Sequence, residues 1–406
     1  MPSAQPDIFT PFTLGGGAIE LKHRVVMAPL TRNRGTKSEK HDRTWIANDL
    51  MRHYYEERAT DGGMLISEAT PVSLEASGMP GVPGTFTDEQ LESWKPVTAA
   101  VKAKGGVFFA QLWHQGRNTA SVLTGSRIVS ASDVPITDAK FGWRGLNPKP
   151  FEAPHALTID EVRATQDDFA RAAGRAREAG FDGVELHAAN GYLFDQFHHT
   201  NVNLRDDIYG GSIENRNRFT LETVDKVIAA VGADRVGVRL APFGMFNQVR
   251  GEQRQEQWTA LCEELGKKGL AYVHFIEPRF DELQSEAEKL ANLDANNPLA
   301  SLEVSLRPYR EALGPSTPVI AAGNYNGSNM NDGLGAEHDL VAFGRYFCSN
   351  EDLVERLRTG APLWHYNRSR FYGPFPDNEI GYTVHPERKT HKPGERIVFE
   401  GEVLKF

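Results

Sequence analysis

Eight short runs of apolar and β-branched residues recur along the chain, and this repetition constrains the fold more than any other feature. Each run is followed by an amphipathic stretch, which is the pattern of parallel strands joined by crossover helices. The runs cover residues 25–29, 63–67, 107–112, 182–187, 236–240, 272–276, 318–322 and 339–344. Because they are nearly continuous in apolar character, they predict strands that are buried on both faces.

Eight strand–helix units in a row predict an α/β fold, a closed (β/α)8 or TIM barrel. The helical intervals are clearest at 158–179, where Thr158, Asp160 and Glu161 form a capped acidic start, and at 215–231. A doubly wound open sheet is the alternative, but no GxGxxG follows the first run. In a barrel, the site is expected where the carboxyl ends of the strands meet the following loops.

Three segments lie outside the repeat. Residues 9–24 contain LGGGAIEL, which predicts an N-terminal hairpin that closes the barrel floor. Residues 115–157 are rich in Gly, Pro and Ser and form a long excursion after strand 3 that is a candidate cover for the site. Residues 374–406 read as a polar tail. Since no linker divides the chain, residues 1–406 are predicted to be a single domain, with the barrel at about 25–372.

Composition narrows the class of protein. The 406 residues include 45 Lys and Arg against 54 Asp and Glu, and this well-mixed charge of −9 argues against nucleic-acid binding. Two cysteines, Cys262 and Cys348, cannot build a disulfide framework or a Cys-rich metal site. The N-terminus has no signal-peptide pattern, and no stretch approaches the roughly 20 apolar residues of a membrane span. We therefore expect a cytoplasmic protein without membrane association.

Polar residues gather at the predicted carboxyl ends of the strands. They include Thr31, Glu68, Gln111, His187, Arg239, Asn324 and Arg345. At the inner rim of a barrel, such groups cost several kcal/mol unless they bind one another or a ligand. Gly323 and Gly344, after the last two strands, would let backbone N–H groups approach a phosphate, although they could equally be ordinary turns. Arg345 would add a charge-assisted contact to that phosphate.

A phosphate at one end of the rim and polar side chains around it outline a flat heterocycle with a phosphorylated tail, for which FMN is suitable. The amide of Gln111 can donate and accept, and so matches the N3–H and C2 carbonyl edge of the flavin ring. Arg239 could place its charge near N1, and Thr31 could donate to the C4 oxygen. The alternatives are that Thr31 bonds its own backbone and that Arg239 pairs with a neighbouring carboxylate.

The HAANGY segment, residues 187–192, carries the most suggestive chemistry. His187 and Asn190 are close enough to donate to one acceptor oxygen, as a developing enolate requires. Tyr192 could then act as general acid and protonate a carbanionic carbon. Taken alone, His187 could be a paired rim residue or a metal ligand, but the Asn at the second position disfavours zinc. His198 and His199 are expected to point apart and to have a structural or surface role.

With these residues in place, the chain resembles the Old Yellow Enzyme family of flavin-dependent ene-reductases. The resemblance covers about residues 12–372. It is carried by RVVMAPLTRNR, ISEAT, AQLWHQGR, GVELHAANGYLFDQF, DDIYGGSIENRNRF and FGRYFCSNEDLVERL, in the family's order. The segments 115–157 and 247–257 depart from the family pattern, so the resemblance implies nothing about their conformation.

The resemblance implies roles for particular residues. FMN would be bound, tightly and without a covalent bond, by Pro29, Thr31, Ala69, Gln111, Arg239, Gly323, Asn324, Gly344 and Arg345. His187 and Asn190 would hold the substrate carbonyl and Tyr192 would donate a proton. Trp113 would shape the pocket and Tyr372 would lie over the substrate side.

The implied activity is the reduction of an activated C=C bond of an unsaturated carbonyl or nitro compound, with NADPH as hydride donor and ping-pong kinetics. The family also implies a monomer or a homodimer. Rival functions are a flavin-dependent redox isomerase, which would consume no net NADPH, and a flavin-binding protein without catalysis. A flavin-free aldolase is weaker, because no Lys lies at a strand end to form a Schiff base.

Overall fold

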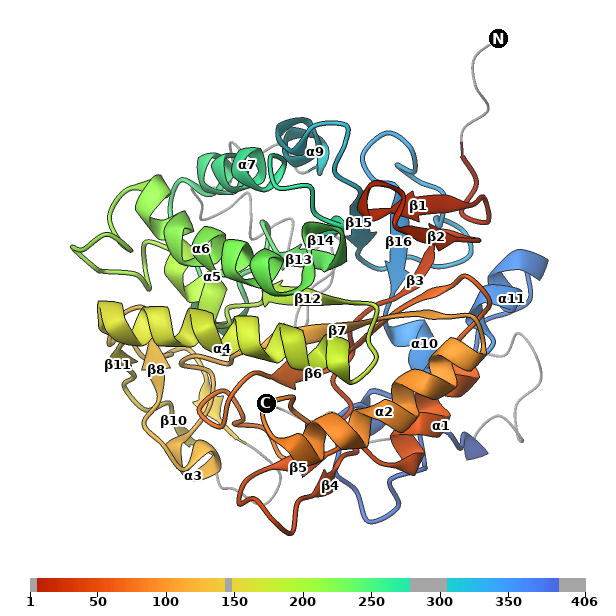
Figure 1. Cartoon of the computed structure of the whole chain (residues 1–406), viewed down its shortest axis with the longest axis horizontal. Helices are drawn as coiled ribbons and strands as arrows, with labels where there is room; N and C mark the ends of the chain where they lie inside the picture. Colours follow the sequence, from red (N-terminus) through yellow and green to blue (C-terminus); the bar gives the residue numbers. More distant parts are fainter. Residues whose placement is uncertain (1–5, 143–147, 278–304, 387–406) are drawn as a thin grey trace.

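The computed structural model describes residues 6–142, 148–277 and 305–386, and eight parallel strands form a closed barrel at its centre (Figure 1). The barrel strands in chain order are β3 (Val25–Met27), β6 (Met64–Pro71), β7 (Val107–Trp113), β12 (Gly183–Ala188), β13 (Val236–Leu240), β14 (Tyr272–Ile276), β15 (Val319–Ala322) and β16 (Leu340–Phe343). Each strand pairs in parallel with the next, and β16 pairs with β3. The predicted TIM barrel is thus confirmed, and the open sheet is excluded.

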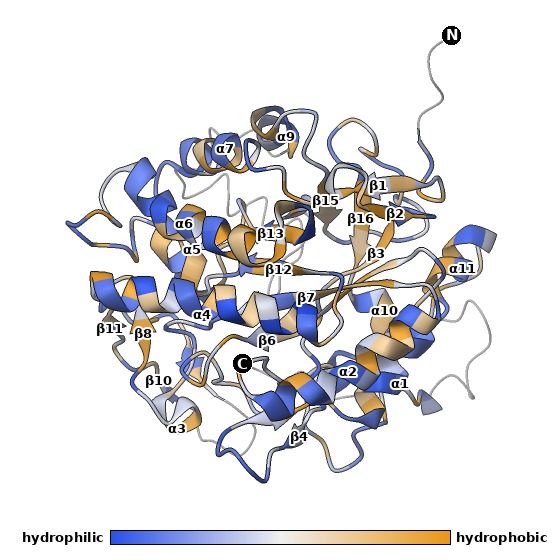
Figure 2. Cartoon of the chain, in the orientation of Figure 1, coloured by the Kyte–Doolittle hydropathy of each residue, from blue (hydrophilic) through white to orange (hydrophobic). Residues whose placement is uncertain are grey.

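Helices surround the barrel. They are α1 (Asp49–Arg58), α2 (Asp88–Ala103), α4 (Ile159–Glu178), α5 (Leu193–His198), α6 (Ile213–Val231), α7 (Arg254–Leu265), α9 (Arg307–Leu313), α10 (Arg345–Ser349) and α11 (Leu353–Thr359). Figure 2 shows their outer faces as mostly hydrophilic. The start of α4 is as predicted: Thr158 accepts from the Glu161 N–H, and the Glu161 carboxylate accepts from the Thr158 N–H, forming a capping box.

The alternation of side chains along the barrel strands separates two apolar layers. On β12, Val184 and Leu186 face outward and join the large cluster between strands and helices. A second cluster fills the lower barrel, where Phe109 and Tyr272 pack against Leu14 of the N-terminal hairpin. That hairpin consists of the antiparallel strands β1 (Phe12–Leu14) and β2 (Ile19–Leu21). The hairpin therefore closes the barrel floor, as the sequence predicted, and leaves the opposite, carboxyl end for the site.

The excursion after β7 contains short elements. They are α3 (Ser121–Thr124), β8 (Val129–Ser130), β9 (Lys140–Phe141), β10 (Lys149–Pro150) and β11 (His155–Ala156). Its described part packs beside α5: the Ser130 hydroxyl donates to Gln196 Oε1 over 2.9 Å. Arg117, at its start, donates to the carbonyl of Asn247 over 2.8 Å, so the excursion also contacts the loop that follows β13. The excursion is thus attached on the carboxyl side of β12.

The segment read as a polar tail is packed where the structure describes it, at 374–386; residues 387–406 lie outside the described residues. Tyr382 is completely buried, and its ring stacks on Tyr54 with centroids 3.9 Å apart. Arg32 donates to the carbonyl of Gly381 and Arg34 to that of Asn378. This part of the chain therefore packs against the segment that follows β3. In the described part of the chain, no helix has both the length and the apolar character needed to cross a membrane.

Candidate active site

The structure brings His187, Tyr192 and Trp113 together at the carboxyl end of β7 and β12. The ring of Tyr192 lies 5.0 Å from that of His187 and 5.0 Å from that of Trp113, edge to face in both cases. Ala69, from the end of β6, belongs to the same small apolar cluster as Trp113 and Tyr192. Three strands that are distant in sequence thus supply neighbouring parts of one site.

Two buried nitrogens in this group have no hydrogen-bond partner among the described residues. They are Nδ1 of His187 and Nε1 of Trp113, and both side chains are nearly inaccessible to solvent. Burial, and next the charge of Arg239, lower the pKa of His187 well below its ordinary value, so the imidazole is neutral at neutral pH. Unpaired buried polar groups are rare in folded proteins and call for a specific explanation, such as a ligand.

Below this group, a buried polar network crosses the barrel. Glu185, on β12, accepts from Gln111 Nε2 over 2.8 Å with one oxygen, and its other oxygen lies 2.9 Å from Nδ1 of His274. Burial alone would raise the pKa of Glu185, but His274 and Arg239 bring it below its ordinary value, so it is a carboxylate at neutral pH. Arg239 therefore has a carboxylate nearby, which is the alternative raised for it from sequence. The Gln111 amide keeps one hydrogen and its carbonyl for another partner.

The remaining predicted residues are spread around the rim. Pro29 and Thr31 follow β3, and Thr31 is half-buried. Gly373 donates to the carbonyl of Arg32, which places the neighbouring Tyr372, 45% exposed, beside the segment of Thr31. These contacts locate Tyr372 at the rim.

On the far side, Gly323 and Asn324 follow β15, and Gly344 precedes α10. A side chain on Gly323 would come within 2.8 Å of Cβ of Glu277, so its neighbours leave no room for one. The Arg345 guanidinium lies over the ring of Tyr366 and donates to its hydroxyl over 3.4 Å.

Asn190 adopts a left-handed conformation with φ 60°, and Asn324 does so with φ 53°. Asn tolerates this backbone conformation better than most residues. The carbonyl of Asn190 accepts from the side chain of Asn247 over 2.8 Å. The loop after β12 is therefore held by the loop after β13.

Sequence reasoning missed several residues that support the site. Glu185 and His274 could have been noticed as polar residues that alternate inward on β12 and β14. Asp195 and Gln196, just after HAANGY, hold the backbone of Gly191 from its N–H and its carbonyl respectively. The prediction that His198 and His199 point apart is wrong, because His199 lies beyond the end of α5 with an extended backbone and both rings face Asp195.

Comparison with known proteins identifies the family. The model of the NADH:flavin oxidoreductase / NADH oxidase family matches residues 7–363. The chain belongs to this family, which includes Old Yellow Enzyme. The resemblance inferred from the motifs is confirmed, and the protein is a flavin oxidoreductase.

Individual relatives are similar along almost their whole length. The flavin oxidoreductase hxnT of Emericella nidulans is 46% identical over 386 residues, which are 93% of this chain and 97% of that protein. The structure of an Old Yellow Enzyme homologue from Zymomonas mobilis has a TM-score of 0.82 at 33% identity and covers 94% of this chain and 99% of its own. Morphinone reductase in complex with tetrahydroNAD has a TM-score of 0.80 at 39% identity, covering 94% and 97%.

Proposed function

We propose that this protein binds FMN at the carboxyl rim of the barrel and uses NADPH to reduce activated C=C bonds of unsaturated carbonyl or nitro compounds. The observation that carries the proposal is the pair of buried nitrogens on His187 and Trp113 that find no partner in the described part of the chain, next to a phenol, in a chain of the flavin oxidoreductase family. A flat acceptor with a carbonyl or nitro oxygen would supply the missing partner. The complex of morphinone reductase with tetrahydroNAD supports a nicotinamide as hydride donor.

The residues around the rim fit FMN. Gln111 retains an amide hydrogen and its carbonyl, which suit the polar edge of the flavin ring. Arg239 provides a buried cation for that edge, and Thr31 and the backbone at Pro29 and Ala69 would line the side of the flavin towards β3.

The phosphate of the cofactor would lie at the opposite end of the rim. There Gly323 has no side chain to cover its backbone N–H. At Gly344, an added Cβ would lie 3.4 Å from the Leu30 side chain. Asn324 and Arg345 follow these glycines and would complete the phosphate-binding segment. Bound there, FMN supplies a carrier that accepts a hydride from the nicotinamide and passes it to the alkene.

The side chains of HAANGY act on the substrate. His187 and Asn190 donate hydrogen bonds to its carbonyl or nitro oxygen, which makes the β carbon electrophilic and stabilises the negative charge that develops on the oxygen. Because His187 is neutral, it donates without losing its proton. Tyr192 delivers a proton to the α carbon while a hydride reaches the β carbon, so the π bond of the alkene is replaced by two C–H bonds and the C–C single bond remains.

The test is an anaerobic stopped-flow experiment on the flavin-loaded protein that measures both half-reactions. NADPH and NADH are compared as reductants, and enones, nitroalkenes and maleimides as oxidants. We expect rapid bleaching of the flavin by NADPH, reoxidation by at least one alkene class, and one NADPH consumed per alkene reduced. Turnover of an enone without net NADPH consumption would instead identify a redox isomerase, and no reoxidation by any alkene would contradict the proposal.

A further inference from the structure

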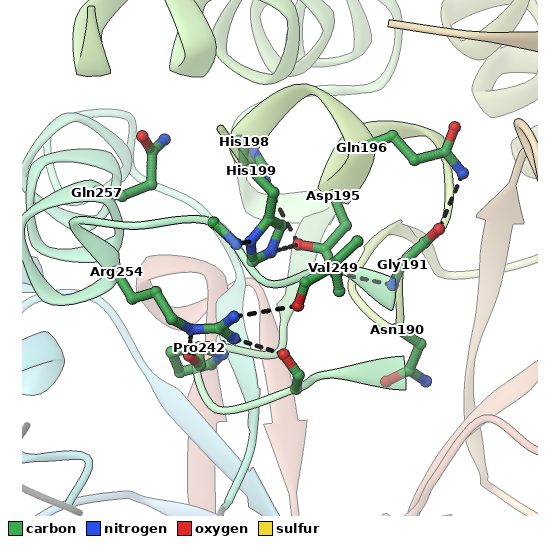
Figure 3. Close-up of polar contacts among 12 residues, drawn as sticks. Asn190, Gly191, Asp195, Gln196, His198, His199, Pro242, Val249, Arg254 and Gln257 are labelled. Carbon is green, nitrogen blue, oxygen red and sulfur yellow. Dashed lines mark hydrogen bonds and ion pairs between the residues drawn. The ribbon is translucent and has the colours of Figure 1, made fainter. Parts of the chain in front are cut away.

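Two loops of the site are joined by a buried chain of hydrogen bonds that the predicted catalytic roles do not use (Figure 3). The N–H of Gly191, between Asn190 and Tyr192, donates to Asp195 Oδ2 over 2.8 Å. The other carboxylate oxygen of Asp195 lies 3.1 Å from Nε2 of His199. On the far side of the same ring, Nδ1 accepts from the N–H of Gly251 over 3.1 Å. One acid and one imidazole thus connect the loop after β12 with the loop after β13.

The hydrogen-bond geometry defines where the proton lies on His199 and whether Asp195 is ionised. Because the Gly251 N–H donates to Nδ1 of His199, the ring proton is on Nε2 and is donated to Asp195. Burial lowers the pKa of His199 to about 4, more than the Asp195 charge raises it, so the ring is neutral at neutral pH. Burial would raise the pKa of Asp195, but His199 and His198 hold it well below its ordinary value. An ionised Asp195 therefore accepts charge-assisted hydrogen bonds from the Gly191 N–H and from Nε2 of His199.

The loop after β13 also touches the loop after β12 at Gly191 and the chain just beyond α5 at Gly251. A side chain on Gly191 would begin 2.5 Å from the carbonyl oxygen of Phe246, and Gly191 has a φ of 70°. A side chain on Gly251 would begin 2.6 Å from the backbone nitrogen of Thr200. The Asn247 side chain adds the hydrogen bond to the carbonyl of Asn190. The contact is therefore close along its length, with no space for a side chain at either glycine.

The second loop is itself anchored to a rigid element. Arg254, in the first turn of α7, is buried and donates to the carbonyls of Pro242 and Val249 over 2.9 and 3.2 Å. This fixes both ends of the 242–249 loop against the helix. Gly191 is therefore connected to α7 in two steps. Asp195 and His199 link it to Gly251, and Arg254 anchors the neighbouring 242–249 loop to the helix.

We propose that Asp195 and His199 are positioning residues that tie the 247–251 segment to Gly191 and so set the positions of Asn190 and Tyr192 towards the substrate. The proposal rests on the proposed function of Asn190 and Tyr192. On this proposal, the 247–251 segment affects ligand affinity through the positions of Asn190 and Tyr192, without its side chains contacting the ligand. Sequence differences in this segment would then change acceptor preference by moving the two donors.

The decisive variants differ in which bonds they remove. His199→Phe keeps a ring in place but removes both hydrogen bonds of the link. His199→Gln restores a donor and an acceptor on one side chain. His198→Phe is the matched control, because His198 is as buried and faces the same carboxylate, yet bonds Thr220 of α6 rather than Gly251. Asn247→Gly is an independent variant: it removes the side-chain donor to Asn190 while suiting the positive φ of 59° at that position.

The first readout is hydrogen–deuterium exchange of the holoenzyme, followed in peptides that cover 187–192 and 247–251. We expect His199→Phe to speed exchange in both peptides by about tenfold, because each loop loses a buried partner. His199→Gln should recover most of the protection, and His198→Phe should leave both peptides close to wild type. If His199→Phe does not fold, Asn247→Gly should raise exchange in the 187–192 peptide by a smaller factor.

The second readout is the affinity of the flavin-loaded protein for a phenol, followed by the change in flavin absorbance. His199→Phe should weaken binding by about tenfold and His199→Gln by less, whereas His198→Phe should not alter it. Unchanged exchange at 187–192, unchanged phenol affinity, or an equal response to His198→Phe would overturn the proposal. A wild-type protein that takes up no flavin would contradict the proposed function instead, and the exchange comparison would still decide whether His199 links the loops.

Discussion

Glu185 and His187 lie two residues apart on β12 and point into the same barrel, yet their surroundings differ completely. Both oxygens of Glu185 have partners, in Gln111 and His274. Nδ1 of His187 has none among the described residues, although the side chain is equally buried. We call Glu185 with Gln111 and His274 the lower layer, and His187 with Tyr192 and Trp113 the upper layer. The carboxylate of the lower layer is satisfied within the protein, whereas the imidazole Nδ1 of the upper layer has no partner in the described part of the chain. The difference teaches that burial of a polar side chain alone does not mark a binding site. A buried polar atom without a partner is a candidate only where other groups of a site surround it, because Nε2 of His274 also lacks a partner among the described residues.

Glu185 of the lower layer nevertheless contributes to ligand binding through two of its neighbours. Glu185 accepts one hydrogen of the Gln111 amide and so orients that side chain, and its negative charge offsets the charge of Arg239; we assign both Gln111 and Arg239 to FMN. We expect substitution of Glu185 to act mainly on stability, and substitutions in the upper layer to act mainly on substrate binding and catalysis. The predictions below test this division.

The largest expected effect is on the chemistry of the upper layer. Tyr192→Phe keeps the ring contacts with His187 and Trp113 but removes the proton donor, so the alkene half-reaction should slow by about 10²- to 10⁴-fold. Flavin reduction by NADPH should stay near the wild-type rate, as measured by stopped-flow absorbance. If both half-reactions fall together, Tyr192 is not the proton donor.

A comparable effect, on stability, is expected in the lower layer. Glu185→Leu leaves Arg239, His274 and Gln111 buried without their carboxylate, and should lower the free energy of unfolding by about 3–5 kcal/mol. Urea denaturation of the purified protein measures this loss. His187→Leu is the control and should change the free energy of unfolding by less than about 1 kcal/mol, because no bond to Nδ1 is lost. Equal losses in the two variants would remove the distinction between the layers.

A smaller effect is expected on ligand affinity. His187→Phe preserves a buried ring but removes one of the two donors to a phenolate oxygen, so phenol affinity should fall by roughly 10- to 100-fold. The change in flavin absorbance on titration gives the dissociation constant. Retained affinity would show that the imidazole does not face the ligand.

The smallest effect is predicted for Trp113→Phe. The variant retains the edge-to-face contact with Tyr192 but removes the buried N–H, whose hydrogen bond to a neutral acceptor is worth about 0.5–1.5 kcal/mol. The KM for nitroalkenes and enones should therefore rise by up to about tenfold, with flavin content unchanged. An unaltered KM for every acceptor would place the Trp113 N–H away from the substrate.

Much of the fold could be predicted because its signals are local. Each apolar run became a barrel strand within a few residues, and the start of α4 was given by Thr158 and Glu161. β6 is the clearest difference, since it continues to Pro71 after an irregularity in its pairing between Ile66 and Ala69. That irregularity depends on the neighbouring strand β7, which a single run of residues does not specify.

Part of the site could also be predicted because its signal is local in sequence. His187, Asn190 and Tyr192 are close in sequence, so their proximity follows from the chain itself. The partners of Glu185 and the Gly251 partner of His199 come from other strands and loops, at separations of 52 to 89 residues. The packing of Tyr382 on Tyr54 joins residues that are farther apart still, and no periodicity in the tail indicates it. Long-range polar pairing is the part that sequence patterns leave undetermined.

The flavin content of the purified protein tests the central claim most directly. The protein is reconstituted with FMN, freed of excess cofactor by gel filtration, and its visible spectrum is compared with the protein concentration. The account predicts close to one FMN per chain, with a new long-wavelength absorbance band when a phenol is added. Colourless protein that retains no FMN after reconstitution would contradict it.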